Sequence, residues 1–159
     1  MKTPLWCLLA VLALSFVAAG KKEPELTVRF YTEGNAQDSL SFALPVVVGS
    51  PPHKAYISKI PNISERDVAA IYLFVGSDGT VGCSFILDEH GKMGLDTLSI
   101  EKRGTSLVAV VNGRQVIDML IDKRISDGIV TIPRGLTIEE GRLLRKTFKS
   151  IRPAAPANQ

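Results

Sequence analysis

The dipeptide Asn112-Gly113 lies between two apolar runs and constrains the local path of the chain more than any other feature of the sequence. Both residue types tolerate the positive φ angles of a type I′ turn, and Asn-Gly between apolar runs is the strongest short signal for a β-hairpin. Residues 107–111 form the run before the dipeptide, and residues 115–121 form the run after it. The sequence therefore predicts a hairpin built from these two strands.

Further short apolar runs, each bounded by glycine, proline or polar residues, predict additional strands. Gly76-Ser77-Asp78-Gly79 separates two of them and predicts a second hairpin with a four-residue loop. Pro45 places its run at a sheet edge or at a break, because proline cannot donate to a central ladder. Pro133 is expected to end the last run. The expected strands cover residues 26–32, 40–48, 55–60, 70–75, 80–87 and 129–132.

Two capping boxes mark where helices are expected to begin. Ser64 with Asp67 resembles a box and predicts a short helix or a single turn, although Glu or Gln is the usual partner. Thr137 with Glu140 matches the usual pattern and predicts a helix that runs to residue 151. The apolar residues of that helix fall on one face, and the cations on its other face are interpreted as solvated.

The middle of the chain predicts one more helix and completes the expected fold class. Residues 88–91 are expected to form a turn, and residues 95–103 a short helix that ends at Gly104. No linker rich in glycine, serine or proline separates the two halves of the chain near residue 88, which favours one shared core. The expected fold is α+β, with a mixed or antiparallel sheet and two to three helices packed on one face.

The beginning of the chain has the order of a secretory signal peptide. Lys2 precedes an apolar run, and the small residues Ala18-Ala19-Gly20 follow that run. The run is shorter than the roughly 20 residues that span a bilayer, which favours cleavage after Ala19 or Gly20 over an uncleaved anchor. A periplasmic or secreted location is therefore expected. The expected parts are a signal peptide at residues 1–20, a single α+β domain at residues 21–152 and a disordered tail at residues 153–159.

The balance of charges argues against one class of partner. The sequence has 19 Lys and Arg residues against 16 Asp and Glu residues, a formal net charge of +3, and the cations are spread along the chain. Nucleic-acid binding calls for a dense basic stripe or for aromatic stacking platforms. Neither is evident, so no nucleic-acid partner is expected. No stable membrane span is expected after signal cleavage either.

Candidates for catalysis or metal binding are few. Cys7 lies in the leader, so Cys83 is left as a single cysteine that cannot form a disulfide within its own chain. Cys83 lies in a strand-like run, where we expect a buried and inert thiol. His53 and His90 lack the spacing of a structural zinc motif. No metal site, cofactor or catalytic residue is predicted, and a small enzyme that uses Cys83 or a histidine is kept as an alternative.

A series of short elements follows in order along residues 88–148. They are a turn and short helix, Gly104, the arm that leads into Asn112-Gly113, Val116-Ile117, Ile125-Ser126-Asp127-Gly128, and Ile132 with Gly135-Leu136-Thr137-Ile138-Glu139-Glu140-Gly141. This stretch resembles part of the first large periplasmic domain of SecD, a subunit of the bacterial protein-export machinery. In that family the region belongs to an α+β head that is associated with contact to exported polypeptide.

This resemblance implies a non-enzymatic exported module that binds a polypeptide or an envelope partner. SecD-type proteins have transmembrane helices that couple export to the proton gradient, whereas none is expected here after the leader. Met119-Leu120 also stands where that family leads us to expect Ala-Pro. A small enzyme and a structural envelope component are the alternatives. The binding residues implied by the resemblance are Asn112, Gly113, Arg114, Asp127 and Gly128.

Overall fold

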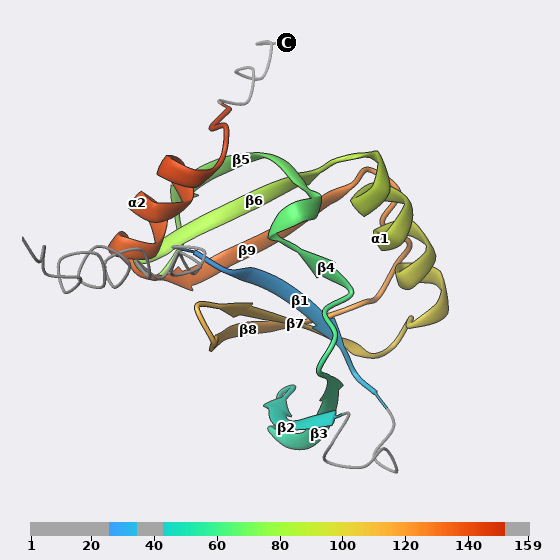
Figure 1. Cartoon of the computed structure of the whole chain (residues 1–159). Helices are drawn as coiled ribbons and strands as arrows, with labels where there is room; N and C mark the ends of the chain where they lie inside the picture. Colours follow the sequence, from blue (N-terminus) through green and yellow to red (C-terminus); the bar gives the residue numbers. More distant parts are fainter. Residues whose placement is uncertain (1–25, 35–42, 152–159) are drawn as a thin grey trace, which may run out of the picture.

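The computed structural model describes residues 26–34 and 43–151, which form antiparallel sheets with helices at their ends (Figure 1). The expected signal peptide at residues 1–20 and the expected tail at residues 153–159 lie outside the described residues. The elements are β1 (Val28–Thr32), β2 (Ala43–Val48), β3 (His53–Ser58), β4 (Ile63–Ser64), the 3-10 helix η2 (Glu65–Asp67), β5 (Val68–Val75), β6 (Val81–Leu87), α1 (Glu89–Glu101), β7 (Ser106–Val111), β8 (Arg114–Leu120), β9 (Ile129–Leu136) and α2 (Ile138–Thr147).

A four-stranded sheet in the order β4-β1-β7-β8 contains the predicted Asn-Gly hairpin. Asn112 and Gly113 adopt φ angles of 49° and 76°, as a type I′ turn requires. The register of β7 against β8 shifts between Ala109 and Val110, which indicates a bulge. The hairpin is confirmed, and β8 is an edge strand of this sheet.

A three-stranded sheet in the order β5-β6-β9 contains the second predicted hairpin. The expectation that Pro133 ends the last strand is wrong, because β9 continues to Leu136. β9 pairs only with β6 and is an edge strand, so a proline there need not cost a ladder hydrogen bond. The register of β6 against β9 also shifts between Val81 and Cys83, opposite the proline.

The hairpin of β2 and β3 forms a separate two-stranded sheet that covers the second face of the four-stranded sheet. Tyr31 of β1 and Val108 of β7 pack there against Val48, Ala55 and Ile57. Side chains alternate between the faces of a strand, so β1 and β7 are covered on both sides, which explains why the run before Asn112-Gly113 is continuously apolar. Pro45 lies in β2, and its predicted edge position is confirmed.

Helix α1 begins earlier than predicted. The carboxylate of Asp88 accepts a hydrogen bond from the Gly91 amide at 2.8 Å and caps the helix, so the turn predicted at residues 88–91 is wrong. A Cβ atom at Gly91 would lie 2.8 Å from the Cβ atom of Asp67, so glycine lets this end of α1 pack closely on η2. The capping box of Ser64 and Asp67 at η2 is confirmed.

Helix α2 begins with the predicted capping box of Thr137 and Glu140 but ends at Thr147. The prediction of a helix to residue 151 is wrong, because the backbone after Phe148 is extended and pairs with β5. The Ile71 amide donates to the Lys149 carbonyl at 2.9 Å, and the Ile151 amide donates to the Ile71 carbonyl at 2.8 Å. These bonds compensate for the helical bonds that the segment gives up.

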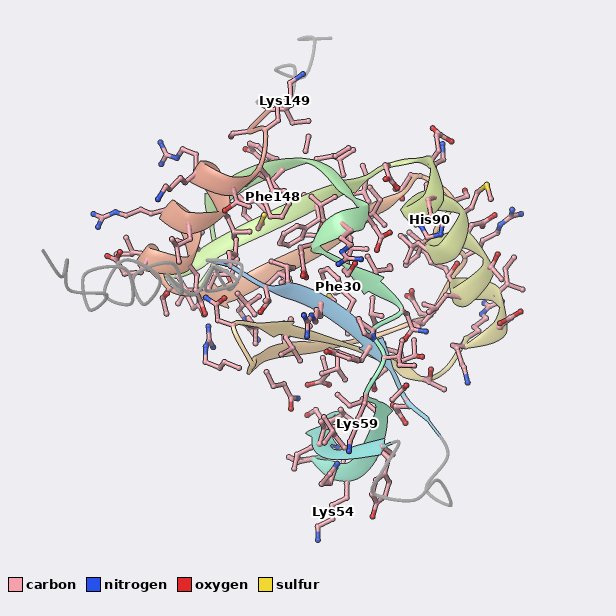
Figure 2. All side chains as sticks on the ribbon, viewed as in Figure 1. Phe30, Lys54, Lys59, His90, Phe148 and Lys149 are labelled. Atoms are coloured by element: carbon pink, nitrogen blue, oxygen red, sulfur yellow. The ribbon has the colours of Figure 1, made fainter. Side chains whose placement is uncertain are left out.

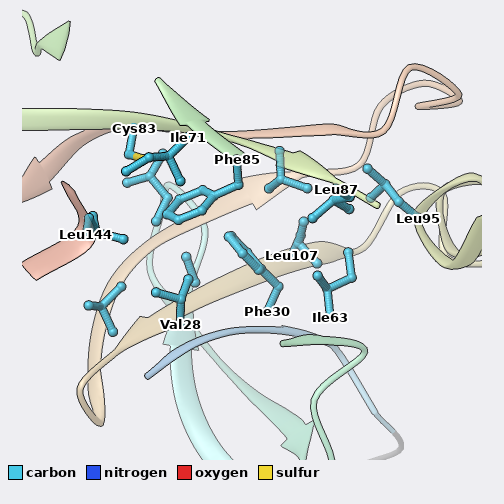
Figure 3. Packing of buried hydrophobic residues seen from close by; sticks show 14 of the residues in the cluster. Val28, Phe30, Ile63, Ile71, Cys83, Phe85, Leu87, Leu95, Leu107 and Leu144 are labelled. Carbon is cyan, nitrogen blue, oxygen red and sulfur yellow. The ribbon is translucent and has the colours of Figure 1, made fainter. Parts of the chain in front are cut away.

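The main core lies between the four-stranded and three-stranded sheets and takes residues from both halves of the chain (Figure 3). Phe30 of β1 and Phe85 of β6 meet there edge to face, with ring centroids 5.6 Å apart. The α+β class is confirmed. Two to three helices on one face are not confirmed, since Figure 1 shows α1 and α2 at opposite ends of the three-stranded sheet. Within the described residues no helix is long and apolar enough to cross a membrane.

Candidate functional site

The tip of the β7–β8 hairpin is tied to the start of β1. The side-chain oxygen of Asn112 accepts a hydrogen bond from the Thr27 amide at 3.0 Å, and the Asn112 amide donates to the Thr27 carbonyl at 3.0 Å. Gly113 completes the turn and has open space where a Cβ atom would be. Both predicted binding residues therefore have a structural role at the tip.

Arg114 links the first residue of β8 to the N-terminus of α2. One guanidinium nitrogen donates to the Glu140 carboxylate at 2.7 Å and to the Gly135 carbonyl at 3.1 Å. The same Glu140 oxygen accepts from the Thr137 amide at 2.7 Å, and the Glu140 side chain is only 10% exposed. Arg114 thus balances a largely buried carboxylate that also caps α2.

Asp127 and Gly128 lie at the opposite end of β9 from the residues that Arg114 contacts. The Asp127 carboxylate accepts a hydrogen bond from the Ile129 amide at 3.0 Å. Gly128 has a φ angle of 74°, and a Cβ atom there would lie 2.9 Å from the Lys92 side chain. The structure therefore brings the five predicted site residues together as two groups, one at each end of β9, and not as one cluster.

At the Asp127 end of β9 lies a cavity of about 360 Å³, which we call the β8–β9 cavity. The edge strands of the two larger sheets approach each other at Val116 and Gly135, where a Cβ atom on the glycine would lie 3.3 Å from the valine side chain. Further along, the edges leave room for the cavity. Most of its lining is apolar, and it includes Met119, Leu120, Ile125, Asp127, Ile129 and Thr131.

The backbone of β9 presents one amide toward the open edge. The Leu87 amide donates to the Gly128 carbonyl at 2.9 Å, so these two residues form a hydrogen-bonded pair. Such pairs alternate with non-hydrogen-bonded pairs along an antiparallel ladder. The backbone groups of Ile129, Thr131 and Pro133 therefore face away from β6. Asp127 already accepts from the Ile129 amide, and proline has no amide hydrogen. Thr131 is therefore the outward position of β9 whose amide lacks a partner among the described residues.

The β8 side of the cavity has a matching open edge. The Ile121 amide donates to the Thr105 carbonyl at 2.9 Å, which by the same alternation turns the backbone of Leu120 away from β7. The Leu120 side chain is 67% exposed and lines the cavity with Met119. Met119 and Leu120, which stand where the resemblance to SecD leads us to expect Ala-Pro, thus lie on the edge strand beside the cavity.

Cys83 lies in the main core and has no exposed surface. Burial raises the pKa of its thiol to about 12, because an apolar environment disfavours the charged thiolate. The thiolate is the reactive form of cysteine, so this side chain is unsuited to nucleophilic catalysis at neutral pH. The predicted burial of Cys83 is confirmed.

His90 belongs to a small polar cluster at the N-terminus of α1 (Figure 2). Its ring nitrogen lies 3.0 Å from the Asp67 carboxylate, and the Asp88 carboxylate lies within 4.8 Å of both. Asp67 and Asp88 also accept capping hydrogen bonds from Ser64 and Gly91. The His90 side chain is 87% exposed, so we interpret the cluster as a capping arrangement and not as a metal site. The spacing of these residues in the sequence does not indicate that they lie together.

The Asp67 carboxylate makes a contribution to stability that depends on pH. Burial on its own would raise the pKa of Asp67, but hydrogen bonds from Ser64 and His90, together with the charge of His90, lower it below 3.8. The folded state therefore favours the charged form. This stability is fully present above the unfolded value of 3.8 and is lost as the pH falls through the lower folded value.

We expect Asp67→Asn to lower the free energy of unfolding by about 1 kcal/mol at neutral pH, because a charged acceptor is replaced by a neutral one. The difference from the unchanged protein should vanish well below pH 3.8. Urea unfolding at both pH values measures it. Asp122→Asn, which removes the same charge from an exposed residue, is the control. A difference that persists unchanged in acid would contradict this role of Asp67.

Comparison with solved structures shows which known protein has a similar fold. A structure of SecDF, described as a membrane component that enhances protein export, aligns with a TM-score of 0.53 over 77% of this chain and 63% of that chain. This chain shares its fold with part of SecDF. The sequence identity to that SecDF structure is 13%. A crystal structure of SecDF in a super-membrane-facing form aligns with a TM-score of 0.51 and 14% identity, over 77% of this chain and 19% of that chain.

The resemblance to a SecD segment is confirmed, and the likeness in fold covers more of the chain than the resemblance in sequence. The aligned 77% of the chain reaches beyond residues 88–148, on which the resemblance in sequence rested. This chain spans less than two thirds of the length of both SecDF chains. No protein-family model matches the sequence, and no curated protein matches it either.

Proposed function

We propose that this chain is an exported, non-enzymatic domain that binds an extended segment of polypeptide in the β8–β9 cavity. The proposal rests on the Thr131 amide, which has no partner in the described part of the chain and lies on an edge strand beside an apolar cavity. Main-chain hydrogen bonds to an open sheet edge bind extended peptides of many sequences, and a pocket beside the edge selects side chains.

The similarity to SecDF supports polypeptide as the ligand. The matched SecDF is a membrane component that enhances protein export. We therefore infer that a domain with part of its fold contacts exported polypeptide chains. The proposal includes a cleaved signal peptide at residues 1–20, a single domain at residues 21–152 and a periplasmic or secreted location. An envelope protein that presents an extended segment would use the same edge.

The five residues implied by the sequence resemblance frame this binding surface. The narrow end of the gap between β8 and β9 is formed by Asn112, Gly113 and Arg114. Arg114 holds β8 there by its hydrogen bond to the Gly135 carbonyl. Asp127 and Gly128 set the wide end, and Asp127 also covers the Ile129 amide. In this proposal they position the two edge strands, and the bound polypeptide pairs with Thr131 between them.

Photocrosslinking tests the location of this site. A photoreactive residue at position 120 should form an adduct with a short peptide of alternating leucine and glutamine, because the exposed Leu120 side chain lies on the wall of the cavity. The same photoreactive residue at position 60 is the matched control. Ile60 is also exposed, and it precedes β4, at the far edge of the same sheet. Mass spectrometry of the adduct measures the yield at each position.

The expected result is an adduct at position 120 that unlabelled peptide competes away, with little adduct at position 60. Equal yields at both positions would mean that the peptide has no preferred site on this surface. No adduct at either position, from protein shown to be folded by circular dichroism, would remove the β8–β9 cavity as a binding site.

A further inference from the structure

Among residues 26–34 and 43–151, the outer edge of β5 is paired along only part of its length. Ile71 exchanges both of its backbone hydrogen bonds with the segment after α2, and the Gly76 amide donates to the Thr80 carbonyl across the hairpin at 2.7 Å. By the alternation of antiparallel pairs, Leu73 and Val75 face outward like Ile71. Within the described residues the pairing ends at Ile151, and no described residue accepts a hydrogen bond from the amide of Leu73 or Val75.

Two adjoining cavities lie beside this open edge. One, of about 380 Å³, is lined by Tyr72 and Ile151, and the other, of about 290 Å³, by Val75 and Ile138. Leu73 and Arg145 line both of them, so we treat them as one groove and call it the β5–α2 groove. Val75 and Ile138 are 80% and 66% exposed, so both offer apolar surface to a ligand in this groove.

The charged side chains of the groove are cations. Arg142 and Arg145 line it, and Arg142 forms an exposed pair with Glu139 at 2.9 Å. No residue in the described part of the chain forms a hydrogen bond or ion pair with the Arg145 guanidinium. An anionic group entering the groove would therefore meet a positive charge beside apolar surface.

We propose that the β5–α2 groove is a second binding site, distinct from the β8–β9 cavity, for an extended peptide in which apolar and acidic residues alternate. The segment that pairs with Ile71 shows how the edge accepts a strand, and the bound peptide continues that pairing along Leu73 and Val75. Alternate side chains of a strand point to opposite sides. One set then contacts the stacked rings of Tyr72 and Phe74, and the acidic set meets Arg145.

Fluorescence polarisation with a labelled peptide of alternating valine and glutamate tests the proposal on the full chain. Val75→Pro removes an outward amide and should weaken binding about tenfold, as expected for the loss of one hydrogen bond. Val75→Thr keeps the amide and is the matched control. Arg145→Glu should weaken binding about tenfold, and Arg145→Lys should retain most of it, because a rim charge acts through attraction to the peptide.

Several results would overturn this site. One is a peptide of alternating valine and lysine that binds as tightly as the valine–glutamate peptide. Another is a double variant, Arg145→Glu and Val75→Pro, that binds as tightly as the unchanged protein. A chain ending at Ile151 that binds when the full chain does not would assign the groove to residues 152–159 of the same molecule. Dimers that Val75→Pro abolishes would assign it to a second copy. Thr131→Pro should leave this affinity unchanged, so failure here is distinguishable from failure of the β8–β9 cavity.

Discussion

Phe85→Ala is expected to lower the free energy of unfolding by about 3–5 kcal/mol, which is a large share of the stability of a domain of this size. Phe85 of β6 has no exposed surface, and its ring packs edge to face on Phe30 of β1 at a centroid distance of 5.6 Å. The substitution removes a large buried side chain and leaves a cavity between the two larger sheets. Urea unfolding followed by circular dichroism measures the loss.

The same pair of rings tests whether the two larger sheets stabilise each other. Met93→Ala, on the exposed side of α1, should change the free energy of unfolding by less than about 0.5 kcal/mol and serves as the control. A double-mutant cycle of Phe30→Ala and Phe85→Ala should give a coupling of about 0.5–1.5 kcal/mol, the range for paired aromatic rings. Strict additivity of the two losses would contradict a shared core between the sheets.

Local signals in the sequence predicted the parts of the fold that depend on a few neighbouring residues. The turn at Asn112-Gly113 needs only two residues that accept positive φ angles. The box of Thr137 and Glu140 needs only one turn of helix. Both are present as predicted, because each depends on groups within a few residues of one another.

Elements whose boundaries depend on distant contacts were predicted less well. The helical spacing continues to Ile151, but the open edge of β5 offers hydrogen bonds that end α2 at Thr147. Asp88 begins a turn or caps a helix equally well by its local chemistry. The close packing of Gly91 on Asp67 favours the helix here, and no short stretch of sequence reveals that contact.

The candidate site could be predicted only as two turns. Glycine and asparagine identify the hairpin tip and the turn at Asp127-Gly128 from the sequence. The cavity beside Asp127 exists because β7 pairs with β1 and β6 pairs with β9, which leaves β8 and β9 as neighbouring edges. Strand order over such distances is not encoded in local patterns, so Leu120 and Thr131 could not be selected in advance.

Thr131→Pro is expected to weaken polypeptide binding at the β8–β9 cavity by about tenfold or more, since it removes the amide that we propose pairs with the bound chain. The substitution should be tolerated by the fold, because this amide faces away from β6 and Pro133 already occupies the next outward position. Thr131→Val keeps the amide. Both variants lose the contact of the threonine hydroxyl with Ser84 at 2.8 Å, so they are matched for that loss.

The affinity of these two variants for a labelled peptide of alternating leucine and glutamine, measured by fluorescence polarisation, tests the central claim most directly. Thermal unfolding of each variant first establishes that it is folded at the temperature of the titration. The account predicts that Thr131→Val binds like the unchanged protein and that Thr131→Pro binds about tenfold or more weakly. Equal affinity of a folded Thr131→Pro and Thr131→Val would contradict binding of polypeptide at the edge of β9.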